Sequence, residues 1–346
     1  MKQEANIYEI AKEAGVSIAT VSRVMNHSPK VSEKNTQRVL AAVEKLNYVP
    51  NNAARSLSTS TSTSVGVVIP DISNPFFSQL LQGITLAADE MGLNIFLFGT
   101  NENPEREHKV LDSMREHRLR GVIITPVSAE DGETLRRLHI FETLGIPVVL
   151  LDREVESTAF DRVVTADEEG VSLAVDELIR IGHRKIAIIT GPEASRPGRE
   201  RFRGYCRAME ANGLPLREEY IRKGNFMVQC AYEQALVLCS LPEPPTAIFS
   251  SNNMTTYGCL KAFGELGLRI GEDIALVGFD DIEELRWLNY NLSVVSRDVP
   301  TMGEQAMRHL MRRFENKIRP EHGTRTCLPT ELILRGSECL PKKKAL

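Results

Sequence analysis

The sequence predicts a small all-α head followed by a two-lobed α/β core with doubly wound parallel sheets. Residues 6–47 carry apolar side chains at helical spacing. Beyond residue 64, short apolar runs alternate with amphipathic stretches, a pattern typical of parallel strands covered by helices. The 346 residues suffice for two or three domains, and the number of apolar runs indicates two lobes.

The head is expected to contain three short helices. The first covers residues 7–14 and ends at Gly15, which permits the turn that follows. Ser17 is placed to cap the second helix, and Ser32 is placed to cap the third.

The first two of these helices have the pattern of a helix-turn-helix. Ala11 is small where two helices must cross closely, and Val16 and Val21 are apolar anchors for the second helix. Small and polar residues face outward beside Arg23, so the second helix can enter a major groove without steric conflict. These outward residues are Ser17, Ala19, Thr20 and Ser22.

The charge distribution agrees with a head that binds nucleic acid. Residues 1–60 hold eight Lys and Arg against five Asp and Glu, so the rest of this −4 chain carries −7. A basic head on an acidic body suits a protein that offers only its head to phosphate.

A composition change at Pro50 marks the end of the head. Residues 51–57 are long enough for about two helical turns, and such a short helix forms only against a partner. A polar Ser and Thr linker follows at residues 58–64. The predicted divisions are a helix-turn-helix domain at 1–49, a hinge helix and linker at 50–63, a core at 64–340 and a basic tail at 341–346. Within the core we expect one lobe from about 64–163 and 293–327, and the other from 164–292 and 328–340.

The core reads as a repeated alternation of strands and helices. The predicted strands are Val65–Pro70, Ile95–Gly99, Val122–Thr125, Val148–Leu151, Ile186–Thr190, Ala247–Ser250, Ile274–Gly278 and Val294–Ser296. The predicted helices are Phe76–Met91, Pro104–Arg118, Glu168–Ile181, Gly198–Asn212, Val228–Leu241 and Met254–Leu266. Ligands of doubly wound folds bind beyond the carboxyl ends of the strands, so we look there for a binding site.

Composition and motifs exclude several classes of protein. The six cysteines form no close pair, which indicates neither a zinc site nor a disulfide framework, and we expect no metal and no cofactor. A P-loop, a G-x-S-x-G elbow and a metal-spaced His/Glu cluster are missing, so we expect no enzyme. The chain shows no signal peptide and no membrane-length apolar run, which favours a cytoplasmic protein.

Several motifs occur in an order that is similar to one known family. These are AGVSIATVSRVMN at residues 14–26, KVSE at 30–33 and LNYVPNNAARSL at 46–57. The chain resembles the LacI/GalR family of bacterial repressors over almost its whole length. The resemblance implies a periplasmic-binding-protein-like core and a sequence-specific repressor. It also implies a homodimer or tetramer that binds a pseudo-palindromic operator and responds to a small carbohydrate-type effector.

The resemblance also implies roles for residues of the head. Ile18 and Ala19 lie where family members vary the residues that face base edges, and Arg23 reaches a guanine or a nearby phosphate. Leu57 matches the hinge leucine that wedges into a base step and kinks the operator. The other implied DNA contacts are Ser17, Thr20, Ser22, Asn26 and Lys30 in the head, and Asn51 and Ala53 in the hinge.

Strand ends in the core carry candidate effector ligands. The stretch DISNPFF at residues 71–77 follows the first strand, and an aromatic there can stack on a sugar or purine ring. Of Phe76 and Phe77 we favour Phe76 as the contact and expect the other in the core. Asp152 and Asp280 each end a strand, where they can accept hydrogen bonds from hydroxyls or cap the following turn.

Further effector residues come from the resemblance and from departures from it. Arg201 matches the family's ligand-clamping arginine, and Phe226 matches an aromatic that closes over the ligand. Three positions depart from the family: Asn252-Asn253 stands for Asn-Asp, Ala166-Asp167 for Asp-Asn, and Arg297 for the usual Gln. Two arginines in one cleft favour a sugar acid or a phosphorylated sugar. The alternative is that Arg297 pairs with Asp280, Asp281 or Asp298.

Two other functions remain open from the sequence. One is a sugar-binding receptor without a DNA role, and the other is a global regulator that responds to a phosphoprotein partner. For a regulator we expect the lobes, joined by crossings near Val163, Asn291 and Leu328, to move around the effector and so change the hinge spacing.

Overall fold

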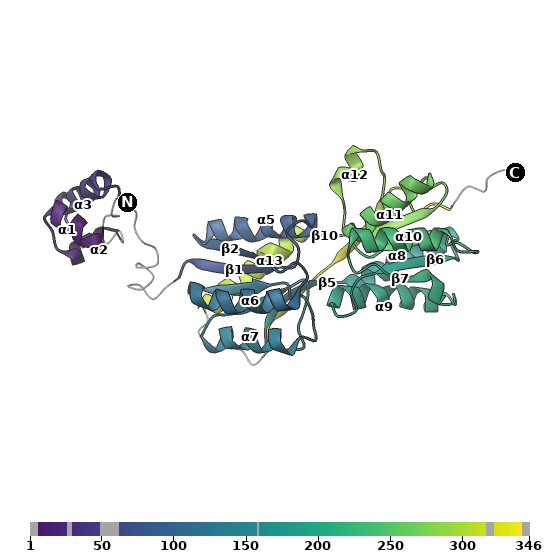
Figure 1. Cartoon of the computed structure of the whole chain (residues 1–346), viewed down its shortest axis with the longest axis horizontal. Helices are drawn as coiled ribbons and strands as arrows, with labels where there is room; N and C mark the ends of the chain where they lie inside the picture. Colours follow the sequence, from purple (N-terminus) through teal and green to yellow (C-terminus); the bar gives the residue numbers. More distant parts are fainter. Residues whose placement is uncertain (1–5, 26–29, 49–61, 158, 316–321, 341–346) are drawn as a thin grey trace. The chain divides into compact units, whose positions relative to one another are not determined.

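The computed structural model describes residues 6–25, 30–48, 62–157, 159–315 and 322–340. The chain divides into two compact units, Met1–Ser62 and Thr63–Leu346, which correspond to the predicted head and core. Both are drawn in Figure 1, and each is described by itself below. The predicted hinge helix and most of the linker, which include Asn51, Ala53 and Leu57, lie outside the described residues, as do Asn26 and the basic tail.

The head consists of the three predicted helices, α1 (Ile7–Ala14), α2 (Ile18–Met25) and α3 (Glu33–Lys45). Helix α1 begins with a capping box between Asn6 and Glu9, and it ends at Gly15, whose φ of 62° is left-handed. Ser17 caps α2 through its Oγ, which accepts from the Thr20 N–H at 3.2 Å. Ser32 stands at the N-cap position of α3, but its side chain makes no capping bond, so that detail of the prediction is wrong.

A small apolar core holds the three head helices together. Ile10, Val21 and Val39, one from each helix, have no exposed surface. This core fixes which face of α2 remains outside, because Val21 and Val24 are both buried beneath it.

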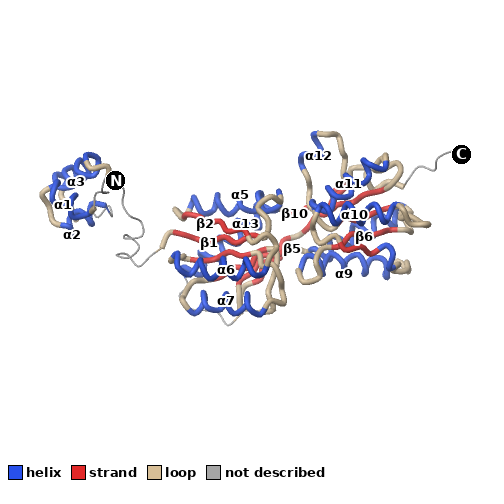
Figure 2. The backbone as a smooth tube through the Cα atoms, viewed as in Figure 1, coloured by secondary structure: helices blue, strands red, loops and turns tan. Residues whose placement is uncertain are grey.

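The first lobe of the core is a six-stranded, all-parallel sheet covered on both faces (Figures 1 and 2). Its strands are β1 (Ser64–Ile69), β2 (Asn94–Gly99), β3 (Gly121–Ile124), β4 (Val148–Leu151), β5 (Asp161–Thr165) and β11 (Arg325–Leu328), in the order β11-β5-β4-β3-β1-β2. Helices α5 (Pro75–Glu90) and α13 (Val299–Glu315) pack on one apolar cluster. Helices α6 (Pro104–Met114) and α7 (Gly132–Thr143) and the 3-10 turn Arg115–His117 belong to the opposite face.

The second lobe repeats this architecture with one antiparallel edge strand. Its strands are β6 (Ile186–Thr190), β7 (Ile221–Lys223), β8 (Ala247–Ser250), β9 (Ala275–Phe279), β10 (Ser293–Arg297) and β12 (Thr330–Ile333), in the order β12-β10-β9-β8-β6-β7. Strand β12 pairs antiparallel with β10. Helices α8 (Asp167–Ile181) and α9 (Arg196–Ala211) cover one face, and α10 (Val228–Cys239) and α11 (Asn253–Leu266) cover the other. The short α12 (Glu283–Trp287) and the 3-10 turn Glu218–Tyr220 complete the lobe.

The structure corrects one predicted lobe boundary. Residues 293–297 form β10 in the second sheet, so the chain returns to the first lobe after Arg297 rather than near Asn291. Val294 and Val295 are fully buried in the second lobe. The apolar run predicted a strand there, but a periodic pattern cannot say which of two sheets a strand joins. The other crossings fall between β5 and α8 and between β11 and β12, close to the predicted Val163 and Leu328.

Two features are absent from the part of the chain that the structure describes. None of the helices there is long and apolar enough to cross a membrane. The same residues contain no group of three His, Cys, Asp or Glu arranged to hold a metal ion.

Candidate functional site: a recognition helix and an interlobe pocket

The outer face of α2 presents the residues that the sequence assigned to DNA. Ser17, Ile18, Ala19 and Arg23 are exposed, and Ile18 keeps 41% of its surface in solvent although it is apolar. Thr20 and Ser22 are half-buried on the same helix, and Lys30 is exposed beyond it. The result is a narrow helix face of hydroxyls and small side chains beside one guanidinium, which suits a major groove.

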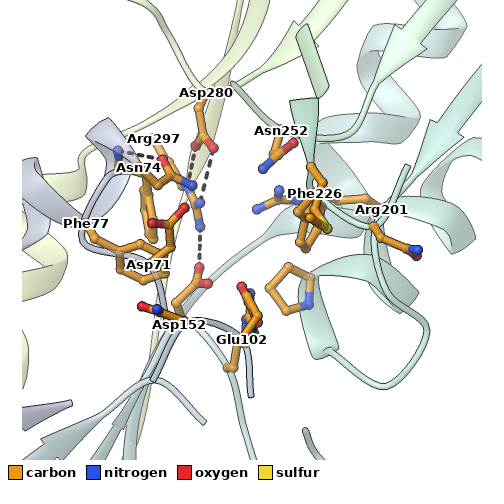
Figure 3. Close-up of a pocket in the computed structure, with 16 residues that line it drawn as sticks. Asp71, Asn74, Phe77, Glu102, Asp152, Arg201, Phe226, Asn252, Asp280 and Arg297 are labelled. Carbon is orange, nitrogen blue, oxygen red and sulfur yellow. Dashed lines mark hydrogen bonds and ion pairs between the residues drawn. The ribbon is translucent and has the colours of Figure 1, made fainter. Parts of the chain in front are cut away.

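The ligand pocket lies between the two lobes of the core, at the carboxyl ends of their strands. Figure 3 shows side chains from both lobes converging on a cavity of about 210 Å3. Its lining includes every effector residue predicted from sequence except Asn253. The lining residues are Asp71, Asn74, Phe76, Phe77, Asn101, Glu102, Asp152, Arg153, Pro197, Arg201, Asn225, Phe226, Met227, Asn252, Asp280 and Arg297.

Backbone geometry turns the two strand-end aspartates into this cavity. Asp152 follows β4 with a φ of 65°, and Asp280 follows β9 with a φ of 72°. Their N–H groups still donate to the adjacent strands, at 2.9 Å from the Val163 O and 2.9 Å from the Val295 O. The strand pairing therefore holds a left-handed backbone at both positions, which costs about 1–3 kcal/mol each and is typical of ligand sites.

Arg297 joins both aspartates. Its Nη1 lies 2.5 Å from the Asp152 Oδ1, and its Nε lies 2.7 Å from the Asp280 Oδ1. The guanidinium also stacks on Phe76, 4.1 Å from the ring centroid. Burial alone would lower the pKa of Arg297, but the attraction of Asp280 and Asp152 outweighs it and raises the pKa above its ordinary value. Arg297 is therefore a firmly charged, internally paired group.

Arg201 is paired as well, but it retains one unused donor. Its Nε donates to the Asp167 Oδ2 at 2.9 Å and its Nη1 to the Ser251 O at 2.6 Å. Its Nη2 is buried without a hydrogen-bond partner among the described residues. Burial lowers the pKa of Arg201, and Asp167 only partly opposes this. A buried donor without a partner costs about 1–3 kcal/mol, so a ligand acceptor at Nη2 is favoured.

Both arginines line the cleft as predicted, but each is already paired with a carboxylate, and Arg297 makes the pair with Asp280 that the alternative named. Their charges therefore give no support to a sugar acid. A third arginine, Arg153, holds Glu102 through two bonds of 2.8 and 2.7 Å. Asp71 binds the Ser73 N–H and hydroxyl, and no Lys or Arg pairs with it in the described part of the chain. Each arginine already faces at least one carboxylate. With Asp167 included, five carboxylates stand against three arginines at the pocket: Asp71, Glu102, Asp152, Asp167 and Asp280 against Arg153, Arg201 and Arg297.

The aromatic side chains surround the arginines. Phe76 and Phe77 both line the cavity, both are buried, and they meet edge to face at 4.9 Å, so neither is confined to the core alone. Phe226 has a φ of 59°, and its ring centroid lies 5.6 Å from the Arg201 guanidinium, across the cavity from Phe77 (Figure 3). A flat ring fits between such walls.

The two adjacent asparagines, of which only Asn253 departs from the family pattern, have different roles. Asn252 caps α11 with its Oδ1, which accepts from the Thr255 N–H at 2.8 Å, and its amide nitrogen is directed toward the cavity (Figure 3). Asn253 instead donates from Nδ2 to the Asn74 Oδ1 at 2.8 Å and joins the two lobes beside the cavity.

The sequence reading missed the pair of Glu102 and Arg153, and also Asn74, Asn101 and Asn225. A signal existed for Asn101 and Glu102, because they follow β2 as Asp152 follows β4. Both have a φ of 54°. Asn adopts a left-handed backbone more readily than most residues, so Asn101 could have been noticed, whereas nothing in the sequence marks Glu102 as left-handed.

Comparisons with known proteins agree with both halves of the structure. The family described as bacterial regulatory proteins, lacI family, matches residues 6–51, and the periplasmic binding protein-like domain matches residues 175–338. The chain is 32% identical over 334 residues to the HTH-type transcriptional repressor PurR of Actinobacillus pleuropneumoniae serotype 3 (strain JL03), covering 96% of this chain and 98% of that relative.

Two solved structures are similar over nearly the whole chain. One is the Lac repressor dimer bound to operator and the anti-inducer ONPF, with a TM-score of 0.85, 26% identity, and coverage of 97% of this chain and 100% of that one. The other is a complex of the transcriptional regulator CelR with cellobiose, with a TM-score of 0.72, 26% identity, and coverage of 96% and 99%.

Proposed function

The chain belongs to the lacI family of bacterial regulatory proteins, and from this premise we propose that it binds a pseudo-palindromic operator as a homodimer under the control of a small sugar-like effector. It is a DNA-binding transcriptional repressor with a ligand-binding core, and it is not an enzyme. We place its action in the cytoplasm, where operator DNA is accessible. The observation that carries the proposal is that one chain has both an exposed recognition face on α2 and an interlobe pocket in its core.

A sugar-like effector is supported by the chemistry of the pocket. Aromatic faces, strand-end carboxylates and buried arginine donors are the groups that bind the ring faces and hydroxyls of a carbohydrate. Two such donors, Arg153 Nε and Arg201 Nη2, have no hydrogen-bond partner among the described residues. The similar structure of the transcriptional regulator CelR is a complex with cellobiose. Since carboxylates outnumber arginines, we favour a neutral sugar over a sugar acid or sugar phosphate.

For the DNA contacts we propose that Ile18 and Ala19 face the base edges and that Arg23 reaches a guanine or phosphate. Ser17, Thr20, Ser22 and Lys30 would then position α2 on the backbone. The exposure of Ile18, Ala19 and Arg23 on α2 supports this assignment. The hinge contacts Asn51, Ala53 and Leu57, and Asn26 of the head, remain part of the proposal.

Control follows from a population shift between lobe arrangements. An effector changes operator affinity only by its difference in affinity for the two arrangements. A pocket built from both lobes supports such a difference, because any change of lobe angle alters the distance between Asp152 and Asp280.

The test is fluorescence anisotropy with DNA that flanks the gene, with and without a panel of neutral sugars, hexuronates and sugar phosphates. The full chain should bind one pseudo-palindrome and change affinity with one class of sugar. A variant that lacks residues 1–60 should lose DNA binding and keep sugar binding. Sugar binding by the full chain without any DNA binding would favour the receptor without a DNA role.

A further inference from the structure

Arg297 lies where the two lobes meet, and it bonds to both of them. It ends β10 in the second sheet, directly before the chain crosses to α13 in the first lobe. Asp152 belongs to the first lobe and Asp280 to the second, and the guanidinium lies between them (Figure 3). A weaker contact of 3.3 Å joins its Nη1 to the Thr165 Oγ1, also in the first lobe.

The groups around the Arg297 side chain form a complete binding site for a planar cation. Carboxylates hold the guanidinium from two sides, the Phe76 ring covers its face at 4.1 Å, and the side chain of Arg297 is 2% exposed. Charge-assisted hydrogen bonds of this kind are stronger than neutral ones, and water is excluded from them. Removal of the guanidinium would leave two buried carboxylates facing each other across the lobes.

The same two carboxylates are the acceptors that a neutral sugar would use. Each sits at the end of a strand with a left-handed backbone, turned into the cavity. Arg297 takes the Oδ1 atom of both, and it covers a face of Phe76 on which a sugar ring would stack. A ligand that needs these Oδ1 atoms, or the covered face of Phe76, has to displace the guanidinium.

We propose that Arg297 is an internal ligand of the pocket: it holds the two lobes together and competes with the effector for Asp152 and Asp280. The holding of the lobes is independent of the effector, whereas the competition rests on the proposed function. Arg297 thereby determines selectivity, because only a ligand that displaces the guanidinium, or binds beside it through Arg201 and Asn252, is accepted.

Hydrogen–deuterium exchange on the full chain without ligand tests the holding of the lobes. The reporter is the amide of Ala129 in the first lobe, which donates to the Ala194 O in the second at 2.8 Å. Loss of a charge-assisted bond across the lobes should speed its exchange by about tenfold or more in Arg297→Ala. Arg286→Ala is the matched control, because Arg286 is an exposed arginine of α12 in the second lobe, paired only at 3.9 Å with Glu283.

Chemical rescue distinguishes the loss of the Arg297 bonds between the lobes from a general loss of packing. Ethylguanidinium at millimolar concentration should bind between Asp152 and Asp280 in Arg297→Ala and restore slow exchange at Ala129. Urea, which is neutral and of similar shape, should not. Arg297→Lys keeps the positive charge and should give intermediate exchange even if the alanine variant fails to fold. Exchange at Ala129 that is unchanged in both variants, or rescue by urea as well, would refute the proposal that Arg297 holds the lobes together.

The competition is tested by titration with D-ribose, D-glucose and D-galacturonate, read by the fluorescence of Trp287, the single tryptophan of the chain, on α12. Arg297→Gln frees both carboxylates and should bind a neutral sugar about tenfold more tightly than the unmodified chain. Equal or weaker binding of every sugar that binds would refute the competition. Failure of all three sugars to bind either protein would count against the proposed sugar effector. The exchange experiment would still decide whether Arg297 holds the lobes together.

Discussion

Removal of the Arg201 guanidinium is the sharpest test of the buried charges around the pocket. In Arg201→Met the apolar stem is kept and the charge is lost. Asp167 then loses the partner at 2.9 Å while it remains fully buried, since it is 0% exposed and Arg201 is 2% exposed. Breaking a buried ion pair by removing one partner costs about 3–5 kcal/mol, and the lost stacking of the guanidinium on Phe279 adds to this. We therefore expect a loss of that size in the free energy of unfolding.

The assay is urea unfolding followed by far-UV circular dichroism, with two comparison variants. Arg207→Met removes another arginine of the same helix, α9, whose partner Glu168 is 3.4 Å away at the surface. That variant should change stability by only about 0–1 kcal/mol. Asp167→Asn in the Arg201→Met background removes the stranded charge and should recover part of the loss. The reasoning is refuted if Arg201→Met is as stable as Arg207→Met, or if the double variant is less stable than Arg201→Met.

Three further outcomes follow from the structure. Burial alone would raise the pKa of Asp167, but Arg201, Arg297 and Arg196 hold that pKa below its ordinary value. The ionised carboxylate therefore stabilises the fold above the unfolded pKa of about 4, and this stabilisation is lost as the pH falls below that value. The unfolding free energies of Asp167→Asn and the unmodified chain should converge as the pH is lowered, and a constant difference would contradict this. Burial lowers the pKa of His183, whose Nε2 lies 3.0 Å from the Glu338 O, so the chain should lose stability as the pH drops below about 6.5, measured by thermal melting, and His183→Gln should flatten that dependence. Arg23→Ala should weaken operator binding by about 1–3 kcal/mol in anisotropy titrations without altering sugar binding, and an equal loss on unrelated DNA would indicate a phosphate contact instead of a guanine.

The lobe assignment shows where sequence periodicity stops being informative. The apolar run at 294–296 predicted a strand, and β10 is there, but its sheet was assigned wrongly. The sequence did not predict strands β5, β7, β11 and β12 or helices α7, α12 and α13. β7 and β12 lie at the edges of the second sheet and β11 at an edge of the first, with few fully buried side chains, so their patterns are weak.

Within the pocket, residue types were predictable and their pairing was not. Asp152, Arg201, Asp280 and Arg297 all reach the cavity that strand-end reasoning predicted. Their charges were read as available to a ligand, and the structure instead pairs them with one another and with Asp167. Such pairing depends on distances of a few ångströms between segments that are more than a hundred residues apart, as for Asp152 and Arg297.

The sequence by itself determined the head, the order of strands and helices in much of the core and the edge of the sheets where ligands bind, because each depends on local spacing and on the direction of parallel strands. Only the tertiary structure decided that Arg297 bonds to both lobes, that Asn253 joins the lobes instead of lining the cavity, and that Asp152 and Asp280 adopt left-handed backbones. These features arise from the way two sheets face each other across three chain crossings. No local pattern encodes that distance, because it is set by the packing of both lobes together.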